Sequence, residues 1–129
     1  MAKASASLRV IVADDDRDTV DTLALLLADA GYVVHKVYSG KDVLPASRVF
    51  RPDAIILDLV VPGISGYGVA QEIRHTYTDG RRPLMIAISG KWGEAPDRLI
   101  AGQVGFDHHL LKPCEPAKLF ELLRPLTGN

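Results

Sequence analysis

The fold is decided by the stretch DAIILD at residues 53–58. An unbroken apolar run of this length is typical of a central strand that is buried on both faces of a parallel sheet. The Pro62-Gly63 pair that follows favours a turn. Ligands of open parallel sheets bind beyond the carboxyl ends of the strands, so Asp58 stands where a reactive group is expected. Taken alone, Asp58 is equally compatible with a residue that caps the following turn.

Four further strand-like runs surround this stretch, and each is followed by a helical pattern. The strands are expected at residues 8–13, 33–37, 83–88 and 106–111. The helices are expected from Asp16 or Asp18 to Gly31, from Ser39 to Phe50, from Gly66 to Tyr77, around Arg98 to Gln103, and from Glu115 or Pro116 to Pro125. This alternation predicts an α/β domain in which five helices wind around both faces of a five-stranded parallel sheet.

Length and composition agree with one such domain. The chain has 129 residues, of which 47% are hydrophobic and 24% charged, so we expect a domain at 8–126 between short tails at 1–7 and 127–129. The net charge of −1 gives no basis for a nucleic-acid partner. The single cysteine excludes an internal disulfide, and no stretch has the apolar length of a membrane span. We therefore expect a cytoplasmic protein that does not insert into a membrane.

Polar side chains stand where the predicted strands end. They are Asp14, Asp15 and Asp16 after the first strand, Asp58 after the third, Ser89 after the fourth and Lys112 after the fifth. Parallel strands end at one edge of a sheet, so these groups are expected to lie close together. Several carboxylates in one pocket repel one another unless a cation lies among them, and Mg²⁺ prefers oxygen ligands and accepts a phosphate as one of them. The alternative for the acids is helix capping, for which Asp16 or Asp18 is suited.

The same set of groups favours phosphoryl chemistry. Asp58 is suited to act as a nucleophile that carries an aspartyl phosphate. The Lys112 ammonium can pair with a phosphoryl oxygen, and the Ser89 hydroxyl can donate to another. The simpler alternatives are a surface lysine and a turn serine.

The chain resembles the receiver domain of two-component response regulators. The resemblance rests on VIVADDD at residues 10–16, ILDLVVPG at 56–63, AISG at 87–90 and LLKP at 110–113. It covers the chain from Leu8 to about Leu126 and implies a flavodoxin-like strand order of 2-1-3-4-5. Each motif is weak alone, but their order at successive strand ends is highly specific.

By this resemblance Asp58 accepts a phosphoryl group from a phosphohistidine of a histidine kinase or histidine phosphotransfer protein. Asp15 and Asp58 are implied as Mg²⁺ ligands, with Asp14 acting through water and the Val60 backbone carbonyl as a further ligand. Lys112 is implied to contact the phosphoryl group. The expected function is a phosphoacceptor switch in a two-component system or phosphorelay, which phosphorylates and dephosphorylates itself and is not a turnover enzyme.

The resemblance also implies how the signal leaves the domain. Ser89 and His109 occupy the two switch positions, and the Lys112–Pro113 peptide bond is expected to be cis. Phosphorylation would then reshape the face of the fourth helix, fifth strand and fifth helix, where a downstream protein target binds. His109 is equally compatible with an ordinary side chain near the end of a strand.

Two other functions use a similar set of residues. One is a phosphatase or phosphotransferase of the haloacid-dehalogenase type, which places its nucleophile on the first strand with a second acid two residues later. Here the residue two positions after Asp58 is Val60. The other is a receiver-like interaction module that is never phosphorylated, although such a module has no reason to keep like charges together.

Overall fold

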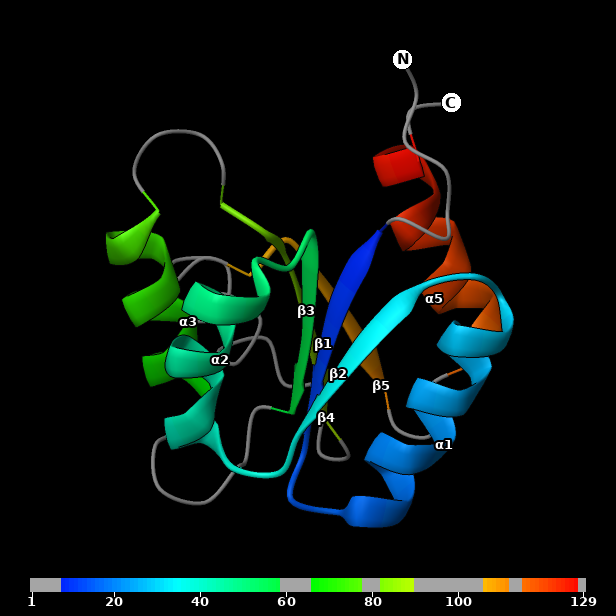
Figure 1. The fold of residues 1–129 in the computed structure, drawn as a ribbon, viewed down its shortest axis with the longest axis horizontal. Coiled ribbons are helices and arrows are strands. Elements are labelled where there is room, and N and C mark those ends of the chain that lie inside the picture. Colours follow the sequence, from blue (N-terminus) through cyan, green and yellow to red (C-terminus); the bar gives the residue numbers. More distant parts are fainter. Residues whose placement is uncertain (1–7, 59–65, 78–81, 90–105, 112–114, 128–129) are drawn as a thin grey trace.

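The computed structural model describes residues 8–58, 66–77, 82–89, 106–111 and 115–127. Within them, five strands form one parallel sheet with helices on both faces (Figure 1). The strands are β1 (Arg9–Ala13), β2 (Val33–Val37), β3 (Ala54–Asp58), β4 (Leu84–Ser89) and β5 (His108–Leu111). Their order in the sheet is β2-β1-β3-β4-β5. The predicted doubly wound fold and strand order are confirmed.

Four α-helices lie within the described residues. They are α1 (Arg17–Asp29), α2 (Val43–Phe50), α3 (Gly66–Thr76) and α5 (Pro116–Leu123). The helix predicted around residues 98–103 lies outside the described part of the chain. The helix predicted from Ser39 begins as a 3-10 turn at Gly40–Asp42 before α2, and α5 continues as a 3-10 turn at Arg124–Thr127. The predicted end of the last α-helix before Pro125 is therefore confirmed.

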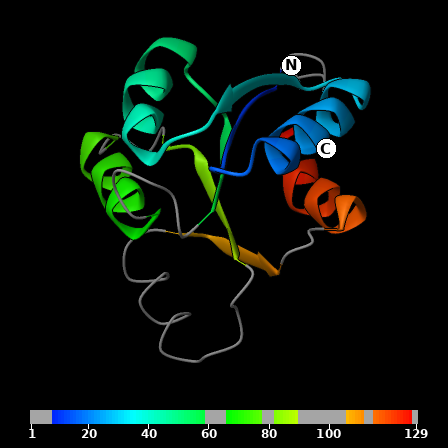
Figure 2. The ribbon, with the colours of Figure 1, turned by 90° about the horizontal axis from the view of Figure 1, so that it is seen from below.

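The sheet separates two hydrophobic cores (Figure 2). Helices α2 and α3 cover one face, where Val43, Val69 and Ile73 are buried against the sheet. Helices α1 and α5 cover the other face, where side chains such as Leu27 and Leu119 are buried. All five residues of β3 are buried, because each of its faces meets one of the two cores. This double burial explains why the strand has no polar residue before Asp58.

Two aspartates anchor the amino ends of strands through their side chains. The Asp53 amide donates to the Arg9 carbonyl at 2.6 Å, and the Arg9 amide donates back to Asp53 Oδ2 at 2.8 Å. Asp107 makes the same pair of bonds with Met85, at 2.8 Å in each direction. The strand predicted at 106–111 therefore begins only at His108, because the Asp107 carboxylate substitutes for a backbone acceptor. These bonds fix where β3 and β5 start relative to their neighbours.

The strand register brings the carboxyl ends to one edge. Ala13 lies opposite Leu57, so the next residues along β1 and β3 are Asp14 and Asp58. Asp58 in turn lies opposite Ile88, the residue before Ser89. Figure 2 looks onto this edge, from below in the orientation of Figure 1. The sheet therefore delivers the predicted site residues of β1, β3 and β4 to one end of the molecule.

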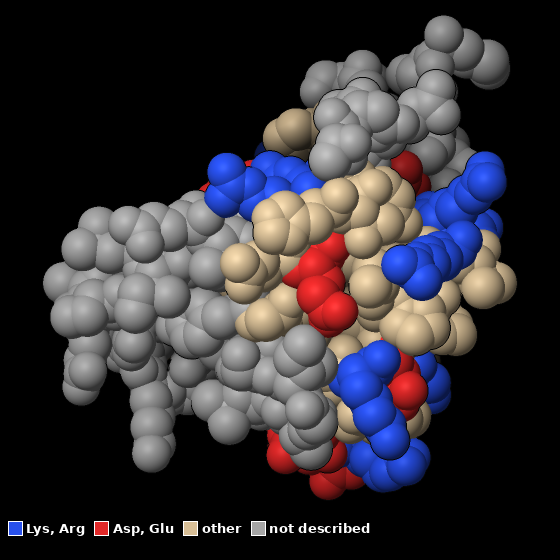
Figure 3. Space-filling model, turned by 90° about the vertical axis from the view of Figure 1, so that its left-hand side faces the viewer, with Lys and Arg blue, Asp and Glu red and all other residues tan. Residues whose placement is uncertain are grey.

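Charge is mixed on the face that carries α2 and α3. Lysine and arginine side chains of the described residues lie in separate places there, with acidic and uncharged side chains between them (Figure 3).

Within the described ranges, no helix is both long enough and apolar enough to cross a bilayer.

Candidate metal and phosphoacceptor site

Three carboxylates meet at the carboxyl edge of the sheet. Asp14 and Asp15 follow β1 directly, and Asp58 is the last residue of β3. One oxygen from each of the three lies within 4.8 Å of the others. Asp14 and Asp58 are 44 positions apart in the sequence, yet they belong to one cluster, as the strand-end pattern predicts.

The cluster is partly enclosed. Asp14 is fully buried and Asp58 is 5% exposed, whereas Asp15 is exposed to solvent. The backbone of Asp14 is fixed by its amide, which donates to the Val37 carbonyl of β2 at 3.2 Å. Its side chain is held as well, because Asp14 Oδ1 accepts the Asp16 amide at 3.1 Å. The site therefore has two buried carboxylates and one that is exposed to solvent.

This arrangement fits a hard divalent cation. Two buried carboxylates and a third beside them repel one another in a medium of low dielectric constant, and a cation among them would offset that repulsion. The cluster offers only carboxylate oxygens, which suit Mg²⁺ better than the nitrogen and sulfur ligands that zinc prefers. Mg²⁺ usually takes only one or two carboxylates and completes its octahedron with water and phosphate oxygens. The three acids therefore fit Mg²⁺ and leave coordination positions for water and phosphate oxygens.

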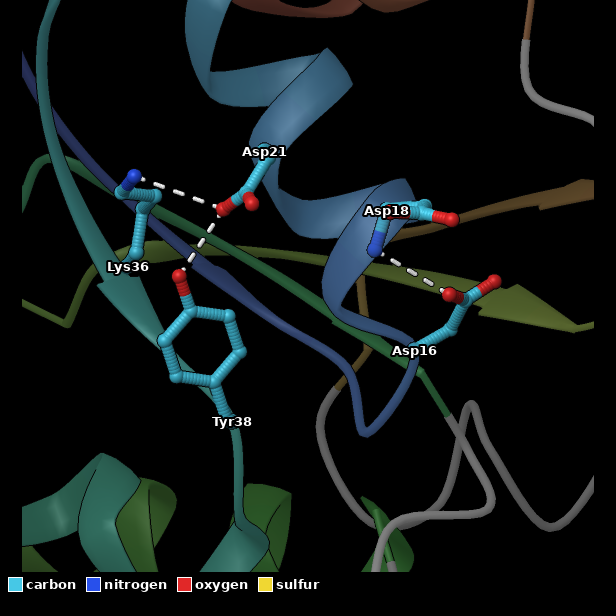
Figure 4. A network of polar contacts seen from close by, with 5 residues as sticks. All are labelled: Asp16, Asp18, Asp21, Lys36 and Tyr38. Atoms are coloured by element: carbon cyan, nitrogen blue, oxygen red, sulfur yellow. Dashed lines mark hydrogen bonds and ion pairs between the residues drawn. The ribbon is translucent and has the colours of Figure 1, made fainter.

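Asp16, the third acid of the run, has a different structural role. It is the N-cap of α1, and its Oδ1 accepts the Asp18 amide at 3.1 Å (Figure 4). Its Oδ2 accepts the Thr19 hydroxyl at 2.8 Å. The sequence left the cap open between Asp16 and Asp18, and the structure assigns it to Asp16. The bond from the Asp16 amide to Asp14 was not predicted, although an aspartate side chain often accepts the backbone amide two residues on.

Asp21 attaches α1 to β2 and to Tyr38, the residue after that strand, through polar contacts. Asp21 accepts the Tyr38 hydroxyl at 2.8 Å and pairs with the Lys36 ammonium at 3.3 Å (Figure 4). The hydrogen bond from Tyr38 is the main cause that lowers the pKa of Asp21 below its usual value, and Lys36 lowers it further. The attachment is therefore complete at neutral pH and is lost when acid protonates Asp21.

The other predicted site residues are placed only in part. Ser89 is the last residue of β4, opposite Leu111 of β5. His109 lies in β5, half-buried, with its ring centre 6.1 Å from that of Phe106. Val60 and the Lys112–Pro113 pair lie outside the described residues, as does the Ser89 side chain. Lys112 follows Leu111 directly in the sequence, and Leu111 ends β5 at the same edge of the sheet.

Replacing Asp15 with asparagine tests whether the cluster holds a cation. The change should weaken Mg²⁺ binding by about tenfold or more, equivalent to about 1.4 kcal/mol, when measured by isothermal titration calorimetry. Without Mg²⁺ the melting temperature should stay level or rise, because one of three repelling charges is removed. Asp29→Asn, the same change at an exposed position in α1, is the control and should leave binding unchanged. Equal Mg²⁺ binding by both variants would argue against a site at this cluster.

Comparison with known proteins gives the family. Residues 10–124 match the model of the response regulator receiver domain. The chain belongs to the response regulator receiver domain family. Receiver domains are the phosphoacceptor switches of two-component signalling, so the predicted family and function are confirmed at this level.

Similar proteins of known sequence or structure agree with this assignment. The regulatory protein VanR of Enterococcus faecium is 32% identical over 113 residues, which are 86% of this chain and 46% of VanR. The chain thus spans about half the length of the curated relatives it matches. A receiver domain of a Pseudomonas aeruginosa sensor histidine kinase is 28% identical, with a TM-score of 0.82 over 95% of this chain and 99% of that one. That structure is described with a magnesium ion coordinated in its active site cleft.

The fold is also shared with more distant proteins. The chemotaxis response regulator CheY4 of Vibrio cholerae is 23% identical and has a TM-score of 0.82, with 92% of this chain and 98% of that one aligned. The same parallel sheet and helix arrangement is thus kept where fewer than a quarter of the residues are identical.

Proposed function

We propose that this receiver domain accepts a phosphoryl group on Asp58 from the phosphohistidine of a histidine kinase or histidine phosphotransfer protein. The observation that carries the proposal is the cluster of Asp14, Asp15 and Asp58, with Asp58 at the end of the central buried strand. Asp15 and Asp58 would hold Mg²⁺ directly and Asp14 through water, with the Val60 carbonyl as a further ligand. When bound, Mg²⁺ supplies positive charge that offsets the charge of the phosphoryl oxygens.

The covalent step is a simple displacement at phosphorus. A carboxylate oxygen of Asp58 forms a bond to phosphorus as the bond between phosphorus and the donor imidazole nitrogen breaks. The electron pair of the broken bond stays on the imidazole nitrogen, which takes a proton from solvent. Asp58 is 5% exposed, so its carboxylate has little contact with bulk water before the phosphoryl group arrives.

Two further residues are suited to assist at the same edge. Lys112, which follows the last residue of β5, would pair with a phosphoryl oxygen. Ser89, which ends β4, would donate its hydroxyl to another oxygen once the phosphoryl group is in place. β4 lies beside β3 in the parallel sheet and β5 lies beside β4, so both strands end at the edge that carries Asp58, which supports the assignment.

The output would pass through Ser89 and His109. Phosphorylation adds about two negative charges at Asp58, and the Ser89 hydroxyl would move toward them. His109, two strands away from Asp58 in the sheet order, would then change its packing and reshape the surface around β5 and α5 for a downstream protein target. Inverting the two states from 1:99 to 99:1 requires about 5.5 kcal/mol from this change. We place this activity in the cytoplasm. We also propose that the Lys112–Pro113 peptide bond is cis.

An enzymatic function has less support. A haloacid-dehalogenase type of phosphatase carries its nucleophile on the first strand, whereas here the buried strand that ends in the cluster's Asp58 is the third. Valine at position 60 also removes the second acid which that chemistry uses. We therefore propose a switch that is phosphorylated and dephosphorylated at Asp58 and does not turn over a substrate.

The test is phosphorylation by a small donor. The protein is incubated with acetyl phosphate in the presence of Mg²⁺ or of EDTA, and its intact mass is followed over time. We expect one phosphoryl adduct per chain with Mg²⁺ and very little with EDTA, because Mg²⁺ offsets the charge of the phosphoryl oxygens. Acetate leaves as Asp58 takes the phosphoryl group.

Two results would contradict the proposal. Rapid consumption of many donor molecules per chain without an adduct would indicate a turnover phosphatase. No adduct with acetyl phosphate, phosphoramidate or a phosphorylated histidine phosphotransfer protein would indicate an interaction module without phosphoryl chemistry.

A further inference from the structure

We propose that Asp16 is a positioning residue for the cation site, although it is not a ligand itself. This inference rests on the proposed function and concerns how the Asp14 carboxylate is oriented. Asp16 stands between two structures: its side chain caps α1, and its backbone amide donates to Asp14 Oδ1 at 3.1 Å. The capping bonds and the bond to Asp14 are therefore made by one residue.

The cap fixes the position of Asp16 relative to the sheet. Both carboxylate oxygens of Asp16 accept bonds from the first turn of α1. Oδ1 accepts the Asp18 amide (Figure 4), and Oδ2 accepts the Thr19 hydroxyl. The Asp16 carbonyl also accepts the Val20 amide at 3.1 Å. Helix α1 is in turn packed on the sheet through buried side chains, which are Val20, Leu23, Ala24 and Leu27. The direction of the Asp16 amide is thus set by a helix that the core holds in place.

That amide restrains the Asp14 side chain. The Asp14 backbone is tied to β2 through the Val37 carbonyl, and Oδ1 is tied to Asp16. A carboxylate that rotates freely would point at the cation only part of the time, and a fixed one does not lose that rotational freedom on binding. Partners that orient the ligands of a metal site typically contribute about 10- to 100-fold to its affinity.

A different role for Asp16 would be purely electrostatic. As an exposed acid one residue away from Asp15, it would attract a cation through its charge alone. The two roles separate with two substitutions. Asparagine keeps an oxygen that caps the helix about as well as aspartate but has no charge, whereas alanine removes the cap as well as the charge.

The positioning role predicts a clear order of Mg²⁺ affinities by calorimetry. Asp16→Ala should bind about tenfold more weakly than the wild type, and Asp16→Asn should stay within about threefold of it. Ala28→Gly is the control for a general weakening of α1, because Ala28 is exposed in the last turn of the helix. It should lower helix stability and leave Mg²⁺ affinity unchanged. Equal losses in Asp16→Asn and Asp16→Ala would overturn the positioning role in favour of charge.

Amide hydrogen exchange without Mg²⁺ gives an independent readout. The amide of residue 16 should be protected in the wild type and in Asp16→Asn, and should exchange faster in Asp16→Ala. Unchanged protection in Asp16→Ala would overturn the inference, because the cap would then not hold the bond to Asp14. If the wild type binds no Mg²⁺ but the exchange pattern is as expected, the proposed cation site fails while the structural coupling of Asp16 to Asp14 stands.

Discussion

Asp58→Asn is expected to form no phosphoryl adduct with acetyl phosphate and Mg²⁺, under conditions in which the wild type becomes fully modified. The amide oxygen of asparagine carries no negative charge and cannot form the acyl phosphate, so the nucleophile is lost outright. The variant should still fold, because asparagine has the shape of aspartate and removes one of three repelling charges. Intact mass spectrometry of both proteins, sampled over one time course, measures the effect.

The control for Asp58→Asn is the same substitution at Asp29, which is exposed in the last turn of α1. Asp29→Asn should be phosphorylated at the rate of the wild type. A phosphoryl adduct of undiminished yield in Asp58→Asn would show that another group is the acceptor. Circular dichroism of each variant excludes unfolding as the cause of a lost adduct.

Leu57→Ala is expected to lower the free energy of unfolding by about 3 to 5 kcal/mol. Leu57 is fully buried in the core between the sheet and helices α2 and α3. Its two neighbours across the sheet are Ala13 and Ala87, which are too short to fill the space that Leu57 would leave. The cavity would therefore persist, and a loss of this size is a large part of the about 5 to 15 kcal/mol that stabilises an ordinary domain.

The matched control is Leu25→Ala in α1. Leu25 is 72% exposed, so its removal opens no cavity, and alanine has a slightly higher helix propensity. Its free energy of unfolding should change by less than about 0.5 kcal/mol in a urea titration. Similar losses in the two variants would mean that the core beneath β3 is not packed as described.

Much of the fold follows from the sequence because the central strands are buried on both faces. The continuous apolar runs of β1, β3 and β4 admit few other interpretations, and each was predicted within one or two residues. The ends of elements were less predictable where side chains replace backbone groups. Asp107 is one case, since its carboxylate pairs with the Met85 amide before the strand itself begins. The 3-10 turn at Gly40–Asp42 is another, because the sequence there starts a helix without fixing its type.

The candidate site was predictable where it depends on sheet topology. Asp14, Asp15 and Asp58 were expected to meet because they follow strands of one parallel sheet, and their oxygens do lie within 4.8 Å of one another. For the third acid of the run the sequence left one choice open, since either Asp16 or Asp18 could cap the following helix. Whether Asp16 faces the cation or the helix depends on the turn after β1, and its side chain caps α1.

The assignments of Lys112, Ser89 and His109 still rest on sequence position. Ser89 ends β4, which pairs with β3, and His109 lies in β5, which pairs with β4. Lys112 lies outside the described residues. Their roles in the phosphorylated state therefore remain predictions that follow from the strands that carry them.

The most direct test of the central claim is to identify the phosphorylated side chain. The wild type is phosphorylated with acetyl phosphate and Mg²⁺ and then reduced with borohydride, which converts an aspartyl phosphate to homoserine. Tandem mass spectrometry of the peptides that contain residues 10–17 and 53–58 locates the modified position. We predict homoserine at position 58 and unmodified aspartate at positions 14, 15 and 16. Homoserine at any of those three positions, or a phosphoryl group on a histidine, would contradict the account.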